Sequence, residues 1–248
     1  MGKFKIAAAQ VGSVRGDITR NLRTHAEAIE VAAEQGVAVL IFPELSLTGY
    51  EPDLAAELAF EDSDRRMEAL GESAKHHQMT VVIGAPLITA GSKPAIGAIV
   101  FAPDGSSSTY AKMHLGSSES AYFKPGCEPK IIESHGQSVG LSICADSSAT
   151  SHPQAYAARG ATVYAAGMFL NAEWYETDAP RLAAYAPAYR MLVVMANHAA
   201  SVGTYRSVGR SAIWAPDGTL LVQAAGTENA LVIATCELAS WSGVVIPL

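Results

Sequence analysis

The sequence lacks the features that would tie the chain to a membrane or to a nucleic acid. No apolar run approaches the ~18 residues that a membrane-spanning helix requires. Only 17% of the 248 residues are charged, the 17 Lys and Arg residues are scattered, and the formal net charge of −7 would repel a phosphate backbone. With 49% hydrophobic residues the chain can bury a sizeable core. We therefore expect a soluble globular protein that binds neither nucleic acid nor membrane.

Cysteine and histidine are too scattered to suggest a disulfide framework or a metal site. Cys127, Cys144 and Cys236 are an odd number and have no metal-type spacing. His76 and His77 are adjacent in a predicted helix, where neighbouring side chains point in different directions. The chain also starts without the apolar segment and cleavage site of a secretory signal. These absences predict a cytoplasmic protein with free thiols, no metal and no cofactor.

Apolar segments with the periods of strands and of helices alternate along the whole chain. Strands are predicted for residues 4–11, 37–42, 80–85, 95–101, 107–111, 137–143, 162–166, 192–197 and 219–224, and helices for residues 21–35, 62–78, 152–159 and 178–189. Two Pro-Asp-Gly turns, at 103–105 and 216–218, lie between strand-like segments and suggest two sheets built on one plan. We expect a single domain over residues 1–248 with an α/β fold. Its architecture should be a four-layer αββα sandwich of two mixed sheets with helices on both outer faces.

Three polar residues at the ends of predicted strands have side chains suited to catalysis: Glu44, Lys112 and Cys144. Groups beyond the carboxyl ends of strands gather at one edge of a sheet. There a carboxylate, an ammonium and a thiol provide a base, an oxyanion stabiliser and a nucleophile. The backbone N–H of Ala145 is a further candidate oxyanion donor. Taken singly, each side chain also fits a structural role, as a loop carboxylate, a solvated lysine or a buried thiol.

Three segments resemble, in order, the signature blocks of the nitrilase superfamily of carbon–nitrogen hydrolases: residues 42–50, 110–115 and 140–146. Shorter matches elsewhere extend the resemblance over nearly the whole chain. It implies the αββα fold, and it assigns the general base to Glu44, the stabiliser of the tetrahedral intermediate to Lys112 and the nucleophile to Cys144. It also matches Glu119 to a second family glutamate that positions the lysine and the substrate. A solvated loop charge is the alternative for Glu119.

The resemblance implies a hydrolase that cleaves an amide or N-carbamoyl bond of a small linear molecule with water, through a cysteine thioester. A true nitrilase, which converts a nitrile to acid and ammonia, is the alternative enzyme. A catalytically silent binding protein also stays open, because residues 145–153 depart from the usual family pattern after the nucleophile. We expect substrate contacts from four residues: Tyr50, Ala145, Asp146 and Phe169. The resemblance further implies a homodimer, for which segments 177–190 and 241–248 supply apolar surface.

The loops that carry these motifs are rich in acidic and aromatic residues and poor in basic ones. The acidic residues are Glu51, Asp53, Glu119, Glu128 and Asp146, beside Tyr50, Tyr122 and Phe123. Basic residues other than Lys112 are few there, namely Lys124, Arg206 and Arg210. A substrate carboxylate without a paired cation would be costly to desolvate, so this composition favours a neutral or cationic substrate. The alternative is that these carboxylates are solvated and do not contact the substrate.

Overall fold

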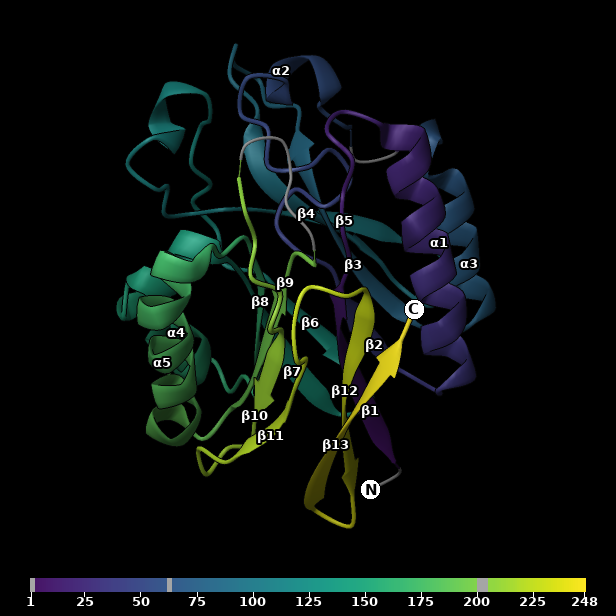
Figure 1. The fold of residues 1–248 in the computed structure, drawn as a ribbon, viewed down its shortest axis with the longest axis vertical. Coiled ribbons are helices and arrows are strands. Elements are labelled where there is room, and N and C mark those ends of the chain that lie inside the picture. Colours follow the sequence, from purple (N-terminus) through teal and green to yellow (C-terminus); the bar gives the residue numbers. More distant parts are fainter. Residues whose placement is uncertain (1–2, 62–63, 200–204) are drawn as a thin grey trace.

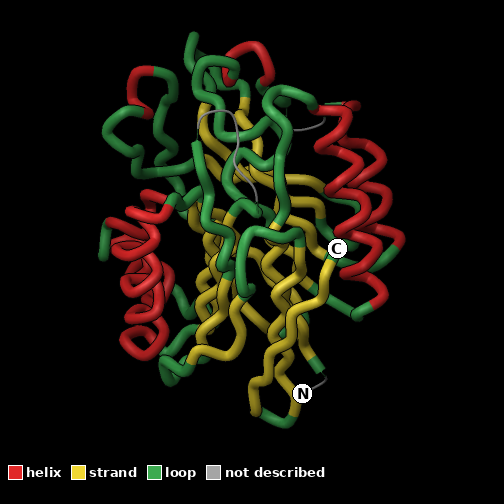
Figure 2. Tube along the Cα trace, in the orientation of Figure 1, coloured by secondary structure: helices red, strands yellow, loops and turns green. Residues whose placement is uncertain are grey.

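Two β-sheets packed face to face form the centre of the molecule, and helices cover the outer face of each (Figures 1 and 2). The computed structural model describes residues 3–61, 64–199 and 205–248. In this part of the chain the first sheet has seven strands, in the order β13 (Ser240–Pro247), β12 (Ala230–Glu237), β1 (Phe4–Gln10), β2 (Val39–Ile41), β3 (Thr80–Leu87), β4 (Ala95–Phe101) and β5 (Ser107–Ala111). The second has six described strands, in the order β11 (Leu220–Gln223), β10 (Ala212–Trp214), β9 (Leu192–Asn197), β8 (Val163–Met168), β7 (Gln137–Ile143) and β6 (Ile131–Ser134).

The central strands of each sheet run parallel, so their carboxyl ends point the same way within that sheet. In the first sheet β1 pairs with β2 and β2 with β3 in parallel, and in the second β7 pairs with β8 and β8 with β9. The outer pairs are antiparallel, and each described sheet has a hairpin at both edges. These are β12–β13 and β4–β5 in the first sheet and β10–β11 and β6–β7 in the second, and β4–β5 and β10–β11 contain the Pro-Asp-Gly turns. The two hairpins predicted from the repeated Pro-Asp-Gly turn are therefore confirmed, one in each sheet.

Helices pack on the outer faces of the two sheets and complete the four layers. Helices α1 (Ile18–Glu34) and α3 (Glu68–His76) cover the first sheet, and α4 (Ser151–Ala158) and α5 (Ala172–Tyr189) cover the second, on the right and left of Figure 1. Strand β1 packs against two neighbouring layers, the other sheet on one face and the helices on the other. Ile6 and Ala8 face the other sheet, Ala7 and Ala9 face the helices, and all four are fully buried. The predicted αββα sandwich is confirmed.

Several element boundaries differ from those predicted. Helix α5 begins at Ala172 rather than at residue 178, because the Asn171 side chain caps it by accepting a hydrogen bond from Trp174 N at 2.8 Å. The helix predicted for residues 62–78 consists of a short 3-10 turn, η1 (Arg65–Met67), followed by α3, and residues 62 and 63 lie outside the described part. Strands β6, β12 and β13 and the short helix α2 (Ala55–Leu58) were not predicted.

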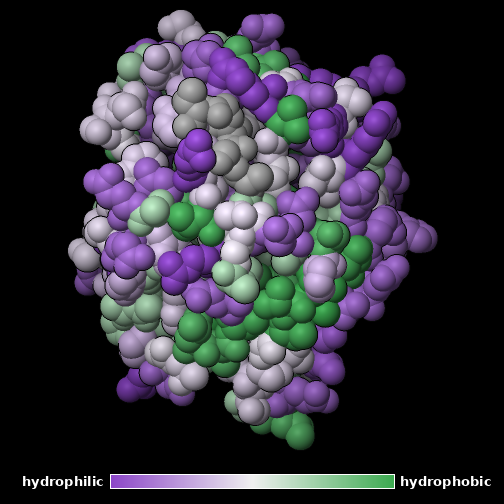
Figure 3. Space-filling model, in the orientation of Figure 1, coloured by the Kyte–Doolittle hydropathy of each residue, from purple (hydrophilic) through white to green (hydrophobic). Residues whose placement is uncertain are grey.

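Apolar side chains gather over strands β11 to β13, in the lower middle of Figure 3. Leu220 of β11 and Val244 of β13 are 48% and 46% exposed. This surface includes part of the segment 241–248 that we expect to take part in pairing of two copies, and the homodimer stays a prediction. No helix in the described residues has the length and apolar character needed to cross a membrane.

Candidate active site

The turn that carries Glu44 lies between the two sheets, after strand β2. Leu45 has a left-handed φ of 51°, which bends the chain sharply beside the glutamate. Gly84 of β3 and Gly167 of β8 lie against this turn, one from each sheet. A Cβ atom at Gly167 would approach the backbone of the turn to 2.8 Å, and one at Gly84 would come closer still. Glycine at both positions therefore lets the turn bring Glu44 into the core, where it is 1% exposed.

A buried cluster of ion pairs joins Glu44, Lys112 and Glu119. Lys112 Nζ lies 2.7 Å from Oε1 of Glu44 and 2.7 Å from Oε1 of Glu119. Tyr50 OH donates a hydrogen bond to Glu119 Oε1 at 2.9 Å, and the Gly116 N–H donates to Glu119 Oε2 at 2.6 Å. The ammonium group is thus held between two carboxylates, one of which is itself fixed by two further donors.

Cys144 stands directly after strand β7, on a tight turn that opens the 3-10 helix η3 (Cys144–Ser148). Its φ of 43° lies in the left-handed region, which is uncommon for a residue other than glycine and is a form of strain often found at functional sites. The thiol Sγ lies 3.9 Å from the carbonyl oxygen of Phe169. Cys144 is partly exposed, whereas Glu44 and Lys112 are buried. The turn therefore places the Cys144 thiol beside the buried charge cluster.

Burial and mutual attraction shift the pKa values of all three groups. Burial raises the pKa of Glu44 to about 7, against the attraction of Lys112, which acts to lower it. Burial and the nearby Glu44 carboxylate raise the pKa of the Cys144 thiol well above its ordinary value. Burial acts to lower the pKa of Lys112, but the negative groups around it outweigh this effect and the pKa lies above its usual range. At neutral pH the thiol and the ammonium are therefore protonated, and Glu44 is partly ionised.

A cavity of about 320 Å³ opens in front of Cys144. Its lining includes Tyr50 and Glu119, Cys144 and Ala145 of η3, and Trp174 and Asp178 from the first two turns of α5. This volume lies near the lower end of the range for small-molecule pockets. The thiol and the second glutamate of the ion-pair cluster therefore share one space that fits a small ligand.

Of the four residues expected to contact the substrate, two line this cavity and two are not part of its lining. Within the described part of the chain Tyr50 and Ala145 line the cavity, whereas Phe169 and Asp146 do not. The Phe169 ring is fully buried and stacks on Tyr50, with ring centroids 5.0 Å apart. Asp146 is fully buried as well. In the structure Phe169 packs against Tyr50 and Asp146 has a different set of partners, and a substrate contact of either residue stays a prediction.

The Asp146 carboxylate joins the loop after β7 to the loop after β5. Its Oδ2 atom accepts hydrogen bonds from Ile143 N at 3.0 Å and from the Tyr110 hydroxyl at 2.6 Å. Its Oδ1 atom accepts hydrogen bonds from the N–H groups of Met113 and His114 at 2.9 and 2.7 Å. One loop carries Cys144 and the other Lys112, so this single buried carboxylate fixes the two loops relative to each other.

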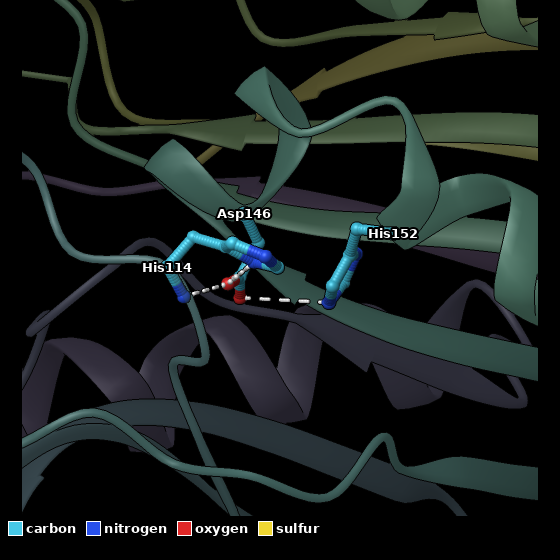
Figure 4. A group of neighbouring side chains, drawn as sticks. All are labelled: His114, Asp146 and His152. Carbon is cyan, nitrogen blue, oxygen red and sulfur yellow. Dashed lines mark hydrogen bonds and ion pairs between the residues drawn. The ribbon is translucent and has the colours of Figure 1, made fainter.

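His114, Asp146 and His152 lie close enough together to suggest a metal site (Figure 4). Their ligand atoms lie within 4.8 Å of one another. However, each Asp146 oxygen already accepts two hydrogen bonds. His152 Nε2 lies 3.0 Å from the Tyr110 hydroxyl, and its Nδ1 lies 2.9 Å from the Tyr164 hydroxyl. Because a metal ion would have to displace these partners, the donor set fits a hydrogen-bond network better than a metal ion.

Asp146→Asn is expected to lower kcat about tenfold or more and to change KM little. An amide NH₂ group would face two hydrogen-bond donors in place of one carboxylate oxygen, so the loops of Cys144 and Lys112 would shift apart. Leaving buried donors unpaired should also cost about 1–3 kcal/mol of stability. Steady-state kinetics and thermal melting would measure both effects, with the exposed turn residue Asp104→Asn as control. A lower melting temperature with unchanged kcat would mean that Asp146 has a purely structural role.

Two histidines without a role in the sequence analysis support the Glu44 turn. His198 Nε2 donates a hydrogen bond to the Glu44 carbonyl oxygen at 2.7 Å, and His25 Nε2 lies 2.9 Å from Ser46 Oγ. Burial lowers the pKa of both histidines to about 4, so both are neutral at neutral pH. His198 directly follows strand β9, just as Glu44 and Cys144 follow strands. This position in the sequence could have identified it as a residue of the site.

The sequence and the structure both match known amide hydrolases. The sequence profile of the carbon–nitrogen hydrolase family matches residues 5–244. An amidase from Nesterenkonia sp. is 26% identical, with a TM-score of 0.85 over 98% of this chain and 90% of that one. A mutant of the Nesterenkonia sp. AN1 amidase, in which acrylamide has added to the active-site cysteine, is 26% identical, with a TM-score of 0.83 over 93% and 92% of the two chains. Another mutant, in complex with butyramide, is 25% identical, with a TM-score of 0.86 over 95% and 92%.

Curated relatives are similar to this chain at comparable levels. The 2-oxoglutaramate amidase of Bacillus subtilis is 28% identical over 247 residues, which cover 95% of this chain and 92% of that protein. The omega-amidase of Danio rerio is 27% identical over 256 residues, which cover 96% and 90%. The glutamine-dependent NAD(+) synthetase of Thermotoga maritima is 31% identical over 153 residues, but the match covers 59% of this chain and 26% of the synthetase. The similarity to the synthetase therefore concerns only about a quarter of that protein.

Proposed function

The chain belongs to the carbon–nitrogen hydrolase family, and we propose that it hydrolyses an amide or N-carbamoyl bond of a small linear molecule through a thioester on Cys144. The observation that carries this proposal is the placement of Cys144 and Glu119 on one cavity, with Glu119 bound to the buried pair of Glu44 and Lys112. The likeness to an amidase in which acrylamide has added to the active-site cysteine supports it.

In the first half of the reaction Glu44 acts as the base. The raised pKa of the Cys144 thiol means that the thiol is protonated at rest and needs a base to become a nucleophile. Glu44 Oε2 has no hydrogen-bond partner among the described residues, so it has room to accept this proton. The thiolate then attacks the carbonyl carbon, and the new oxyanion is stabilised by Lys112 Nζ and the Ala145 N–H.

Collapse of this tetrahedral intermediate breaks the carbon–nitrogen bond and leaves an acyl thioester on Cys144. The departing nitrogen takes the proton from Glu44 and leaves as ammonia or an amine. Glu44, again a carboxylate, then takes a proton from a water molecule that attacks the thioester, and the acid and the free thiol are released. A pKa of about 7 suits one group that must accept and return a proton in both halves.

Intact-protein mass spectrometry after brief exposure to a panel of small amides tests this proposal. The expected result is a mass increase equal to the acyl group on the wild-type chain, with release of ammonia or amine, and no such adduct on Cys144→Ala. Consumption of a nitrile without release of free amide would instead favour a true nitrilase. If no amide, carbamoyl compound or nitrile forms an adduct or is consumed, a catalytically silent binding protein is the better interpretation.

A further inference from the structure

The charged residues that line the cavity in front of Cys144 are acidic. Among the described residues they are Glu119 and Asp178, and neither a lysine nor an arginine lines it. Both Glu119 oxygens are occupied, because they accept hydrogen bonds from Lys112, Tyr50 and Gly116. Asp178 is therefore the carboxylate in this lining that remains available to a ligand.

Asp178 lies in the second turn of α5, and its side chain is 16% exposed. Its Oδ1 atom lies 2.5 Å from Nη1 of Arg181, and the described residues give its Oδ2 atom no hydrogen bond. The same Arg181 nitrogen also donates to Ser148 Oγ at 3.0 Å, so the guanidinium is already engaged by two partners. Burial raises the pKa of Asp178 in spite of this arginine, so Arg181 alone does not compensate the carboxylate.

An aromatic ring lies beside this carboxylate. Trp174 precedes Asp178 by one helical turn, and side chains four residues apart lie on the same face of a helix. The indole lines the cavity and is 40% exposed. A cation held near Asp178 would therefore also lie within reach of an aromatic face, which attracts cations.

Of the acidic loop residues named in the sequence analysis, Glu119 lines this cavity, but both of its oxygens are occupied. Glu51 and Asp53 both pair with Arg15, and Asp146 bridges two loops. The available carboxylate on the cavity belongs to Asp178, which lies in α5 and outside those motif loops. The small side chain of Ala145, next to the nucleophile, lies on the same cavity as Asp178 and leaves space between them.

We propose that the substrate is an amide whose far end carries a protonated amine, and that Asp178, with Trp174 beside it, binds this ammonium group. The inference rests on the proposed amide hydrolysis and adds the charge of the substrate. A carboxylate at the same end would lie against Asp178 in a cavity without a basic lining residue among those described, and would lose solvation without gaining a partner.

Binding of matched amides to Cys144→Ala tests the proposal without turnover. Butanamide, its ω-amino analogue and its ω-carboxylate analogue, together with longer homologues of each, would be titrated by calorimetry. A charge-assisted hydrogen bond should make the best ω-amino amide bind about tenfold or more tightly than its neutral counterpart. Equal binding of the two, or tighter binding of the carboxylate, would overturn the proposal whatever the variants below show.

Substitutions on α5 test whether Asp178 is the group responsible. Added to Cys144→Ala, Asp178→Asn should remove the preference for the ω-amino amide, and Arg181→Met should increase it by freeing the carboxylate. Glu173→Gln, the same change of charge at an exposed position of the same helix, should leave it unaltered. A preference that persists in Asp178→Asn would exclude Asp178. Because these assays measure binding, a failure of the charge preference is distinct from a failure of hydrolysis, which the acyl-adduct experiment reports.

Discussion

Cys144→Ala is expected to reduce amide turnover on the order of 10³-fold or more, the scale seen when a covalent nucleophile is removed. Alanine cannot form the thioester. Without attack by the thiolate, no oxyanion would form for Lys112 and the Ala145 N–H to stabilise. The fold should be unaffected, because a small side chain replaces a small one on a turn whose hydrogen bonds are made by the Asp146 carboxylate and the Ser147 hydroxyl. Release of ammonia or amine, measured at saturating amide, would give the loss in kcat.

The other two cysteines provide matched controls for this experiment. Cys127 is exposed. Cys236 lies in β12, opposite Phe4 of the neighbouring strand β1. Neither lines the cavity within the described residues. Cys127→Ala and Cys236→Ala should therefore keep most of the activity, and an equal loss at either would contradict the assignment of Cys144 as the nucleophile.

The order of layers could be predicted from sequence because local patterns specify it. Apolar segments alternate between strand and helix periods, and two Pro-Asp-Gly turns mark equivalent hairpins. The ends of the elements depend on contacts that the pattern does not contain. The start of α5, before the predicted first residue 178, is stabilised by the Asn171 cap. Strand β12 depends on pairing with the distant N-terminal strand β1, in which Phe4 lies opposite Cys236, and β13 in turn pairs with β12.

The reactive groups of the site could be predicted better than its walls. Glu44, Lys112 and Cys144 follow strands, and the topology of parallel strands brings such positions together. The direction of a side chain depends instead on packing. Asp146 lies two residues from the nucleophile yet points to the loop after β5, and Phe169 is covered by Tyr50. Trp174 and Asp178 reach the cavity only because α5 starts immediately after β8, which the sequence pattern did not indicate.

Glu44→Gln is expected to lower kcat/KM by about 10²–10⁴-fold, the usual contribution of a general base. The pH dependence provides a second signature. Burial raises the pKa of Glu44 to about 7, and only the ionised form can accept the thiol proton. Wild-type kcat/KM should therefore rise with pH through about 7 and level off above it, with the apparent pKa belonging to the coupled cluster rather than to one residue. The residual activity of the Gln variant should lack this rise.

Stability measurements separate loss of the base from loss of the fold. A pKa that is higher in the folded chain than in the unfolded chain means that the folded state holds the proton more tightly. This group's contribution to stability is therefore fully present below the unfolded value and falls as pH rises towards about 7. Gln cannot ionise, so Glu44→Gln should melt no earlier than wild type at pH 8, with Lys112 still paired to Glu119.

Glu27→Gln, an exposed position on α1, should change neither activity nor its pH profile. Retained activity with an unchanged rise near pH 7 in Glu44→Gln would show that another group is the base.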